Sequence, residues 1–269
     1  MKTYQRGGYF NQSQTFHPFY QPEQIKKEEL DKILETTPNC KFIYVIPDFQ
    51  NPTGRTWSME RRQKFMEVVN KHNLPVLEDN PYGELRYEGT ILPSLKSMDT
   101  KGLVMFLGTF SKIFCPGLRL GWIAAEHSLL SEFVKIKQSA DLHTSNFDQG
   151  VADAYMEQYD LDEHVKEIVA LYKHRRDLIL ESMEKYFPAG TEWTHPEGGL
   201  FLWLTFPEGV SARKVFNKCI EMKVAGVIGD AFYPNQKTDR SMRINYSNMP
   251  DDRIVEGIQR MAKAIKECM

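Results

Sequence analysis

The first half of the chain carries apolar runs that predict the strands of a parallel sheet. These runs are continuous rather than alternating, as in strands whose two faces are both buried, and they lie at residues 41–46, 74–77 and 103–107. After the first run, Ser58 precedes apolar residues at helical spacing, and Glu60 falls in the first turn of that helix. A strand, a helix and a second strand joined in this way predict a parallel βαβ unit.

Beyond residue 159 the sequence predicts a long helix followed by short strands and helices, which indicates a second domain. Residues 1–22 show neither a helical nor a strand period and are interpreted as a loop or arm. The other expected elements are a helix in 23–34, a strand at 119–125, a helix capped by Ser128, a long helix ending at Pro188, a strand at 200–206, a helix capped by Ser211, strands near 224–228 and 242–246, and a last helix from Asp251. The predicted fold class is therefore α/β, with a mainly parallel sheet and flanking helices in residues 1–160 and a small α+β domain in residues 161–269.

Polar residues that could take part in catalysis or binding follow the predicted strands. Asn51, Asp79 and Lys112 each come shortly after one of the apolar runs. In an open parallel sheet the carboxyl ends of the strands meet at one edge, and ligands bind beyond that edge. We therefore expect these three side chains to gather at one site.

The segment GTFSKIFCPGLRLGW, residues 108–122, predicts a reactive amine beside a phosphate site. A lysine held in a partly dry pocket loses its proton more easily than one in water, and the free amine attacks carbonyl groups. The hydroxyls of Thr109 and Ser111 and the guanidinium of Arg119 match the oxygens of a phosphate dianion. The Pro116-Gly117 turn would bring Arg119 back beside Lys112.

Composition narrows the class of protein. The chain has 269 residues, of which 41% are apolar and 26% charged, enough for one large domain or two modest ones with a core. A net charge of −2 does not favour a nucleic-acid partner, and no apolar run approaches the ~20 residues of a membrane span. The cysteines, which are Cys40, Cys115, Cys219 and Cys268, lack metal or redox spacing, and no export signal follows Met1. We expect a cytoplasmic protein without a metal site.

Three segments, in this order, resemble the motifs of the class I/II aminotransferases, the fold-type-I family that uses pyridoxal 5'-phosphate. Residues 46–54, IPDFQNPTG, resemble the family's asparagine motif, and residues 108–122 resemble its lysine signature. Residues 77–89, LEDNPYGELRYEG, resemble its aspartate-and-tyrosine motif, in the form found in aminoadipate and kynurenine aminotransferases and in the aminotransferase-like domains of some bacterial regulators. The resemblance extends from about Cys40 to the C-terminus.

The resemblance implies transfer of an amino group between an amino acid and a 2-oxo acid. It makes Lys112 the catalytic residue, which holds the cofactor as a Schiff base and then moves a proton as general base and acid. Asp79 would keep the ring nitrogen of the cofactor protonated, and Asn51 and Tyr82 would hydrogen-bond its phenolic oxygen. The phosphate would be bound by Thr109, Ser111 and Arg119.

The resemblance also implies a substrate anchor near the C-terminus. Arg243, in the segment SMRINYS, resembles the arginine that pairs with the α-carboxylate of the substrate, and Asn51 would share this contact. Gly198-Gly199 resembles a glycine pair near the substrate, and residues 230–233 take the place of another family loop. The expected substrates are aromatic, 2-aminoadipate-like or a broad set of amino acids, and the expected assembly is a homodimer.

Two further interpretations stay open at this stage. The same lysine and aspartate serve other pyridoxal-phosphate chemistry on amino acids, namely β-elimination, racemisation and decarboxylation. A catalytically silent, ligand-binding domain like those of the regulators is the interpretation outside enzymology.

The segment before the asparagine motif is short for this family. Family members have there several sheet elements, a glycine-containing phosphate loop at a helix N-terminus and an aromatic residue that stacks on the cofactor ring, whereas fifty residues precede Asn51 in this sequence. We therefore expect this chain on its own to bind pyridoxal phosphate weakly or not at all, with little transaminase activity. We also expect an apolar sheet edge that a partner subunit covers.

Overall fold

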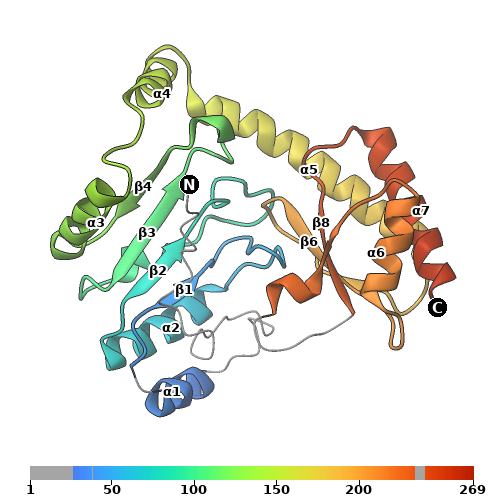
Figure 1. The fold of residues 1–269 in the computed structure, drawn as a ribbon, viewed down its shortest axis with the longest axis horizontal. Coiled ribbons are helices and arrows are strands. Elements are labelled where there is room, and N and C mark those ends of the chain that lie inside the picture. Colours follow the sequence, from blue (N-terminus) through green and yellow to red (C-terminus); the bar gives the residue numbers. More distant parts are fainter. Residues whose placement is uncertain (1–26, 38, 234–239) are drawn as a thin grey trace.

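The computed structural model describes residues 27–37, 39–233 and 240–269. These residues form two sheets and the helices around them (Figure 1). The first sheet has the strand order β1-β2-β3-β4 and the second has the order β5-β6-β8-β7. The arm expected at 1–22 and the start of the helix expected in 23–34 lie outside the described residues.

The first sheet confirms the predicted βαβ unit. Its strands are β1 (Ile43–Val45), β2 (Val76–Asp79), β3 (Val104–Thr109) and β4 (Gly121–Ala124), of which the first three are parallel and β4 runs antiparallel to β3. The helix α2 (Met59–His72) joins β1 to β2 and begins at Ser58, whose hydroxyl accepts a hydrogen bond from the Arg61 N–H at 3.3 Å. The apolar side of α2 packs on one face of this sheet and forms the core of residues Phe65, Met66, Val68 and Val69 with Val45, Val76 and Val104.

The helices of the first half lie in two groups, one on a face of the first sheet and one beyond its edge strand β4 (Figure 1). The remaining elements of this half are α1 (Lys27–Thr36), the 3₁₀ turns η2 (Lys96–Met98) and η3 (Pro116–Leu118), α3 (His127–Ala140) and α4 (Asn146–Gln158). The helix α1 is joined to α2 by ion pairs, among them Lys71 Nζ to Asp31 Oδ2 at 2.7 Å. The helices α3 and α4 stand beyond β4, on the side away from the second sheet (Figure 1).

The second sheet is antiparallel and has its own core. Its elements are β5 (Glu192–Trp193), β6 (Phe201–Thr205), α6 (Ala212–Glu221), β7 (Val227–Ile228), the 3₁₀ turn η4 (Gly229–Phe232), β8 (Ser241–Asn245) and α7 (Asp251–Glu267). Leu202, Leu204 and Met242 on the strands pack with Met261 and Ile265 of α7, and all five are almost fully buried. The small α+β unit expected in this half of the chain is therefore present.

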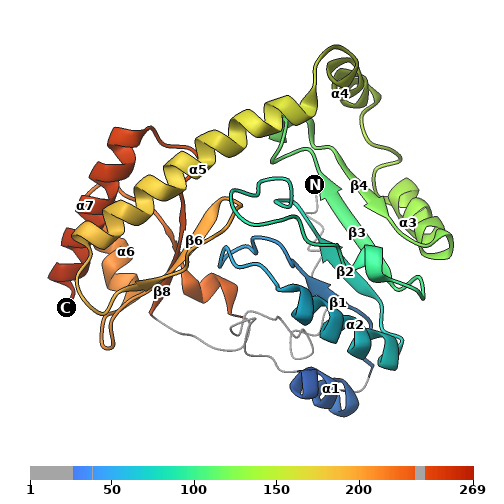
Figure 2. The same cartoon turned by 180° about the vertical axis from the view of Figure 1, so that it is seen from behind.

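The long helix α5 (Leu161–Tyr186) belongs to both halves of the molecule. Its first turns, through Val165, Ile168 and Tyr172, pack on a buried cluster that contains Phe49 and Tyr82. Its later residues, Ile179 and Met183, belong to the core of the second sheet. Seen from behind, the helix runs from the neighbourhood of α4 to that of α7 (Figure 2). The boundary between residues 160 and 161 stays a prediction.

Several expected boundaries were wrong. Ser128 does not cap α3, because Glu126 already has extended backbone and its carbonyl accepts the Leu130 N–H at 2.9 Å. The strand expected at 119–125 begins only at Gly121, since Arg119 has left-handed backbone with φ 57°. The helix α4 and the short strand β5 were not predicted, and Asp79 is the last residue of β2 rather than a residue after it. Within the described ranges, no helix is both long enough and apolar enough to cross a membrane.

Candidate active site

The predicted site residues lie at the carboxyl ends of the three parallel strands. Asp79 ends β2, and Asn51 lies in the turn that follows β1. Lys112 is half-buried in a turn directly after β3, which the Phe114 N–H closes by donating to the Phe110 carbonyl at 2.9 Å. The topology therefore brings the three residues to one edge of the sheet, as expected for parallel strands.

The Asn-Pro-Thr-Gly turn is docked on the second sheet. Gly54 has φ +70°, and a Cβ atom added there would lie 2.2 Å from the backbone carbonyl oxygen of Phe201, so this position requires glycine. The Thr194 hydroxyl donates to the carbonyl of Thr53 at 2.8 Å and holds the same turn from a second direction. The docking carries Asn51 to the strands of the second sheet.

Asn51 and Arg243 form a direct contact between the two halves of the site. Arg243 lies on β8, and its Nη1 donates to Asn51 Oδ1 at 2.6 Å. The guanidinium carbon lies 4.2 Å from the ring centroid of Phe201 and 5.2 Å from that of Phe232. Burial lowers the pKa of Arg243, which the nearby Tyr82 hydroxyl partly offsets. A half-buried cation between two aromatic rings is a favourable site for a carboxylate, because the surrounding water is reduced.

Asp79 and Tyr82 form the other end of the site. Burial raises the pKa of Asp79, and a hydrogen bond from the Tyr44 hydroxyl to Asp79 Oδ2 opposes that shift. Tyr82 is 5% exposed, and its pKa rises to about 12, mainly through burial, with a further contribution from the charge of Asp79 and an opposing one from Arg243. Tyr82 is therefore a neutral hydrogen-bond donor at physiological pH, within electrostatic range of both Asp79 and Arg243.

The residues expected to bind phosphate are only partly assembled. The Thr109 hydroxyl donates to the Leu120 carbonyl and accepts the Ser111 N–H, both at 3.1 Å. Arg119 is exposed, and its Nη1 donates to the Pro116 carbonyl at 3.1 Å. Thr109 and Ser111 are thus brought together, whereas Arg119 would have to leave Pro116 to join them. The phosphate-binding roles of these three residues stay predictions.

The glycine pair Gly198-Gly199 has a visible packing role. A Cβ atom added to Gly198 would lie 2.4 Å from the Leu85 carbonyl oxygen, and one added to Gly199, which has φ +75°, would lie 2.5 Å from Phe49 Cβ. The pair therefore allows the segment before β6 to approach closely the segments that follow β1 and β2. Its expected place near the substrate stays a prediction.

Tyr44, Phe201 and Phe232 contact predicted site residues but were missed as candidates from the sequence. Tyr44 interrupts an otherwise aliphatic strand, which is a signal that the sequence offers. Phe201 contacts Arg243 from β6, and Phe232 contacts it from η4, within the loop 230–233 that resembled a family loop. The folded arrangement was needed to show both ring contacts with Arg243.

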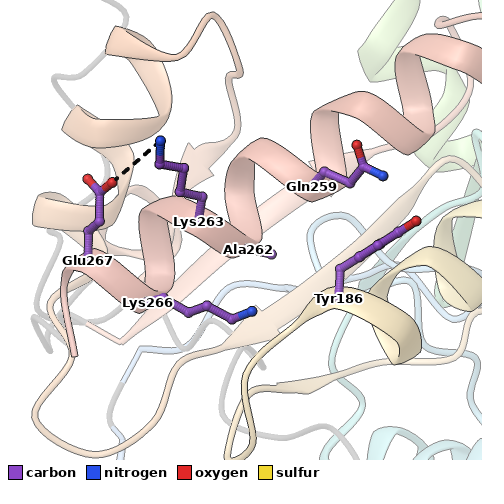
Figure 3. Close-up of a pocket in the computed structure, with 6 residues that line it drawn as sticks. All are labelled: Tyr186, Gln259, Ala262, Lys263, Lys266 and Glu267. Carbon is purple, nitrogen blue, oxygen red and sulfur yellow. Dashed lines mark ion pairs between the residues drawn. The ribbon is translucent and has the colours of Figure 1, made fainter.

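Two surface hollows lie outside this group of residues. One of about 460 Å³ is formed between the end of α5 and α7 and is lined by Tyr186, Gln259, Ala262, Lys263, Lys266 and Glu267, with Lys266 extending toward Tyr186 (Figure 3). The other, of about 440 Å³, lies between β4 and α4, where Phe110, Leu120 and Met156 contribute to its wall. Neither hollow contains Asn51, Asp79, Lys112 or Arg243.

The α/β fold and this group of residues define the class to which the protein belongs. Residues 13–261 match the family model described as aminotransferase class I and II. The chain belongs to this family, which confirms the resemblance of its three motifs.

Similar proteins agree with this assignment. The chain is 42% identical over 245 residues to aromatic-amino-acid aminotransferase 1 of Thermococcus litoralis, a match that covers 91% of this chain and 59% of the relative. The solved structure of a multiple substrate aminotransferase from Thermococcus profundus is 42% identical, with a TM-score of 0.85 over 90% of this chain and 60% of that one. A kynurenine aminotransferase from Pyrococcus horikoshii is 41% identical, with a TM-score of 0.85 and the same coverage of 90% and 60%. The predicted fold class is confirmed, and the chain spans about 60% of the length of these relatives.

Proposed function

We propose that this protein catalyses the pyridoxal 5'-phosphate-dependent transfer of an amino group between an amino acid and a 2-oxo acid. The observation that carries the proposal is the 2.6 Å hydrogen bond between Arg243 Nη1 and Asn51 Oδ1, which joins two motifs from different sheets beside Tyr82. The names of similar proteins, which refer to aromatic amino acids, 2-aminoadipate, kynurenine and multiple substrates, support aromatic, 2-aminoadipate-like or broad substrates.

The residues at the sheet edge fit the ring end of the cofactor. Asp79 Oδ1 accepts no hydrogen bond from any residue that the structure describes, so this oxygen is available to a ring nitrogen. Tyr82 supplies a neutral phenol for the ring oxygen. At the phosphate end, Arg119 would have to exchange the Pro116 carbonyl for a phosphate oxygen. When bound, pyridoxal phosphate supplies an electron-accepting ring that makes loss of the substrate Cα proton feasible.

The protein's own residues would divide the remaining tasks. Asp79, as a carboxylate, holds a proton on the ring nitrogen by charge and hydrogen bonding. Lys112 takes the proton from the substrate Cα as a general base and returns it as a general acid. Arg243 binds the substrate α-carboxylate, and its bond to Asn51 already restricts the orientation of the guanidinium.

The wider organisation is part of the same proposal. We propose a large cofactor-binding domain in residues 1–160, a small domain in residues 161–269 and a cytoplasmic homodimer. The exposed apolar side chains of β4, Trp122 and Ile123, support a covered interface, and the free state of Cys40, Cys115, Cys219 and Cys268 supports a reducing compartment.

Covalent labelling tests the assignment of Lys112. The protein is incubated with pyridoxal phosphate, reduced with borohydride and digested for peptide mapping, and we expect the label on Lys112. Lys112→Ala should lose this label, whereas Lys135→Ala, which removes an exposed lysine of α3, should keep it. A label mainly at another lysine would refute the proposed catalytic role. The method also detects weak binding, so the expectation that this chain alone binds the cofactor weakly can be measured at the same time.

Product analysis separates the possible reactions. With an aromatic amino acid and 2-oxoglutarate, transamination produces glutamate, whereas elimination, racemisation and decarboxylation do not. Glutamate formation that depends on Lys112 is the expected result. Labelling of Lys112 without turnover of any amino acid would instead identify a silent ligand-binding domain.

A further inference from the structure

Tyr44 reaches the proposed cofactor aspartate from the neighbouring strand. In the parallel pair β1-β2, Tyr44 lies opposite Leu77, so Tyr44, Leu77 and Asp79 share one face of the sheet. Asp79 is two residues beyond Leu77, a diagonal separation that a long aromatic side chain can span. The Tyr44 hydroxyl accordingly donates to Asp79 Oδ2.

The opposite face of the same strands is occupied differently. Ile43, Val45 and Val76 are buried there against α2. Glu78 is also on that face, where its carboxylate accepts the N–H groups of Leu95 and Lys96, each at 2.8 Å. Tyr44 is therefore not part of the apolar core, and at 36% exposure it contributes little of the burial that stabilises the sheet.

Among the described residues, Tyr44 and Tyr82 are the polar groups with an established interaction with the Asp79 carboxylate. Tyr44 approaches it from β1, the residue paired with Asp79 on β3 is the apolar Leu107, and Tyr82 is near enough for its phenol to sense the carboxylate charge. Arg243 affects Tyr82 from β8, and Glu78 is turned to the other face of the sheet. Among these described neighbours, Tyr44 is the group that donates a hydrogen bond to Asp79.

We propose that Tyr44 is a positioning residue of the active site, which binds Oδ2 of Asp79 and thereby presents Oδ1 to the ring nitrogen of the cofactor. The proposal rests on the proposed function for the identity of the group that Asp79 holds. A carboxylate with one oxygen fixed has a defined direction for the second, which is the form of support that orients ligating residues in metal and cofactor sites. The hydrogen bond also favours the charged form of Asp79 in a partly buried place, because the donor replaces lost water.

The first test uses the cofactor-free protein. Aspartate carboxyl carbons are labelled with ¹³C, the Asp79 signal is assigned by its loss in Asp79→Asn, and the signal is followed as a function of pH. In Tyr44→Phe, which keeps the ring and removes the hydroxyl, the midpoint for Asp79 should move to higher pH. Tyr159→Phe, at the exposed end of α4, should leave it unchanged.

The second test measures the cofactor. Loss of outer-shell hydrogen bonds around metal ligands costs about 10–100-fold, and on that basis we expect Tyr44→Phe to weaken pyridoxal phosphate binding about tenfold. The effect should be strongly reduced in an Asp79→Ala background, where no carboxylate remains to be positioned. A purely structural tyrosine would lower stability but leave the Asp79 midpoint in place.

The outcomes separate this inference from the proposed function. An Asp79 midpoint that is the same in Tyr44→Phe and the parent overturns the positioning role, even if Lys112 is labelled normally. A shifted midpoint with unchanged cofactor affinity overturns it as well. Absence of label on Lys112 in the parent overturns the proposed function, whereas the titration still decides whether Tyr44 controls Asp79.

Discussion

The second sheet and the segment from β4 to α4 use their apolar residues in opposite ways. In the second sheet, α6 and α7 bury their apolar sides, with Val215 and Cys219 on the first helix and Ile258 and Met261 on the second. Within residues 121–160, all of which the structure describes, Ala152 is the one buried residue. The comparison teaches that an amphipathic pattern specifies which side of a helix should be covered, but not what covers it.

The position of each region in its sheet explains this contrast. The strands β6 and β8 are central in the second sheet, and α5, α6 and α7 pack with them in one core. By contrast, β4 is an edge strand that is exposed at all four positions. Its Trp122 ring packs against Gly108, where any side chain would collide with it. The same ring lies edge-on to Phe110, with ring centroids 5.1 Å apart. The segment is therefore held mainly by local contacts, and its apolar residues Val134, Ile136 and Phe147 face outward.

Replacing one apolar side chain by alanine in each region should produce the largest difference, which is in the free energy of unfolding. Leu202 on β6 is fully buried, so Leu202→Ala should lower the free energy of unfolding by about 2–5 kcal/mol through lost contacts and a cavity. Phe147 on α4 is 78% exposed, so Phe147→Ala should change that free energy by no more than about 0.5 kcal/mol. Urea unfolding of both variants beside the parent measures the difference.

A large effect of Phe147→Ala would break the comparison. It would mean that the outer face of α4 is covered in solution, by a second copy of the chain or by another polypeptide. Repeating the unfolding at several protein concentrations distinguishes self-association, because only then does the midpoint depend on concentration.

Hydrogen exchange should resolve the same contrast element by element. Opening of α3 exposes less additional apolar surface, since its apolar residues are at most half-buried, whereas opening of α7 exposes six buried residues. We expect the amides of α3 to exchange with an opening free energy at least about 2 kcal/mol lower than those of α7. Mass spectrometry of peptides from the two helices provides the measurement. Equal protection would show that α3 is stabilised by contacts beyond those described here.

Local chemistry in the sequence predicted much of this architecture. Ser58 and Ser211 were recognised as helix caps because their hydroxyls accept N–H groups three residues later, a pattern contained within a few residues. The three parallel strands were predicted because continuous apolar runs depend on burial alone. The gathering of Asn51, Asp79 and Lys112 followed from that topology.

Features that depend on distant partners were harder to predict. The contact of Arg243 with Asn51 joins positions far apart in the chain, and the resemblance to a family suggested both residues without giving the bond between them. The helix α4 was missed because its apolar residues, such as Phe147, Val151 and Met156, are not buried and leave no clear stripe. Arg119 carries the expected side chain, but its left-handed backbone and its bond to Pro116 direct the guanidinium elsewhere.

Asp79, at the carboxyl end of β2, is a partly buried polar group and differs from both regions compared above. Its burial costs stability because a carboxylate is removed from water. Burial raises the pKa of Asp79 above its ordinary value of 3.8, so the charged form is less stable in the folded chain than in the unfolded one. Asp79→Asn removes that charge and keeps an acceptor for the Tyr44 hydroxyl. We expect the cofactor-free variant to be more stable than the parent by about 1 kcal/mol at neutral pH.

The pH dependence of this gain tests its cause. Well below pH 3.8 Asp79 is protonated in both states, so the variant and the parent should have similar stability, and the gain should appear as the pH rises from there through the folded pKa. Asp31→Asn is the control of opposite sign, because hydrogen bonds from Lys71 and His72 lower the pKa of Asp31. That variant should be less stable than the parent at neutral pH and approach it in acid. If Asp79→Asn gave no gain at neutral pH, the Tyr44 hydrogen bond would already offset the cost of burying the carboxylate. The surroundings of Asp79 would then stabilise the fold, as the core of the second sheet does, whereas the segment from β4 to α4 leaves its apolar residues uncovered.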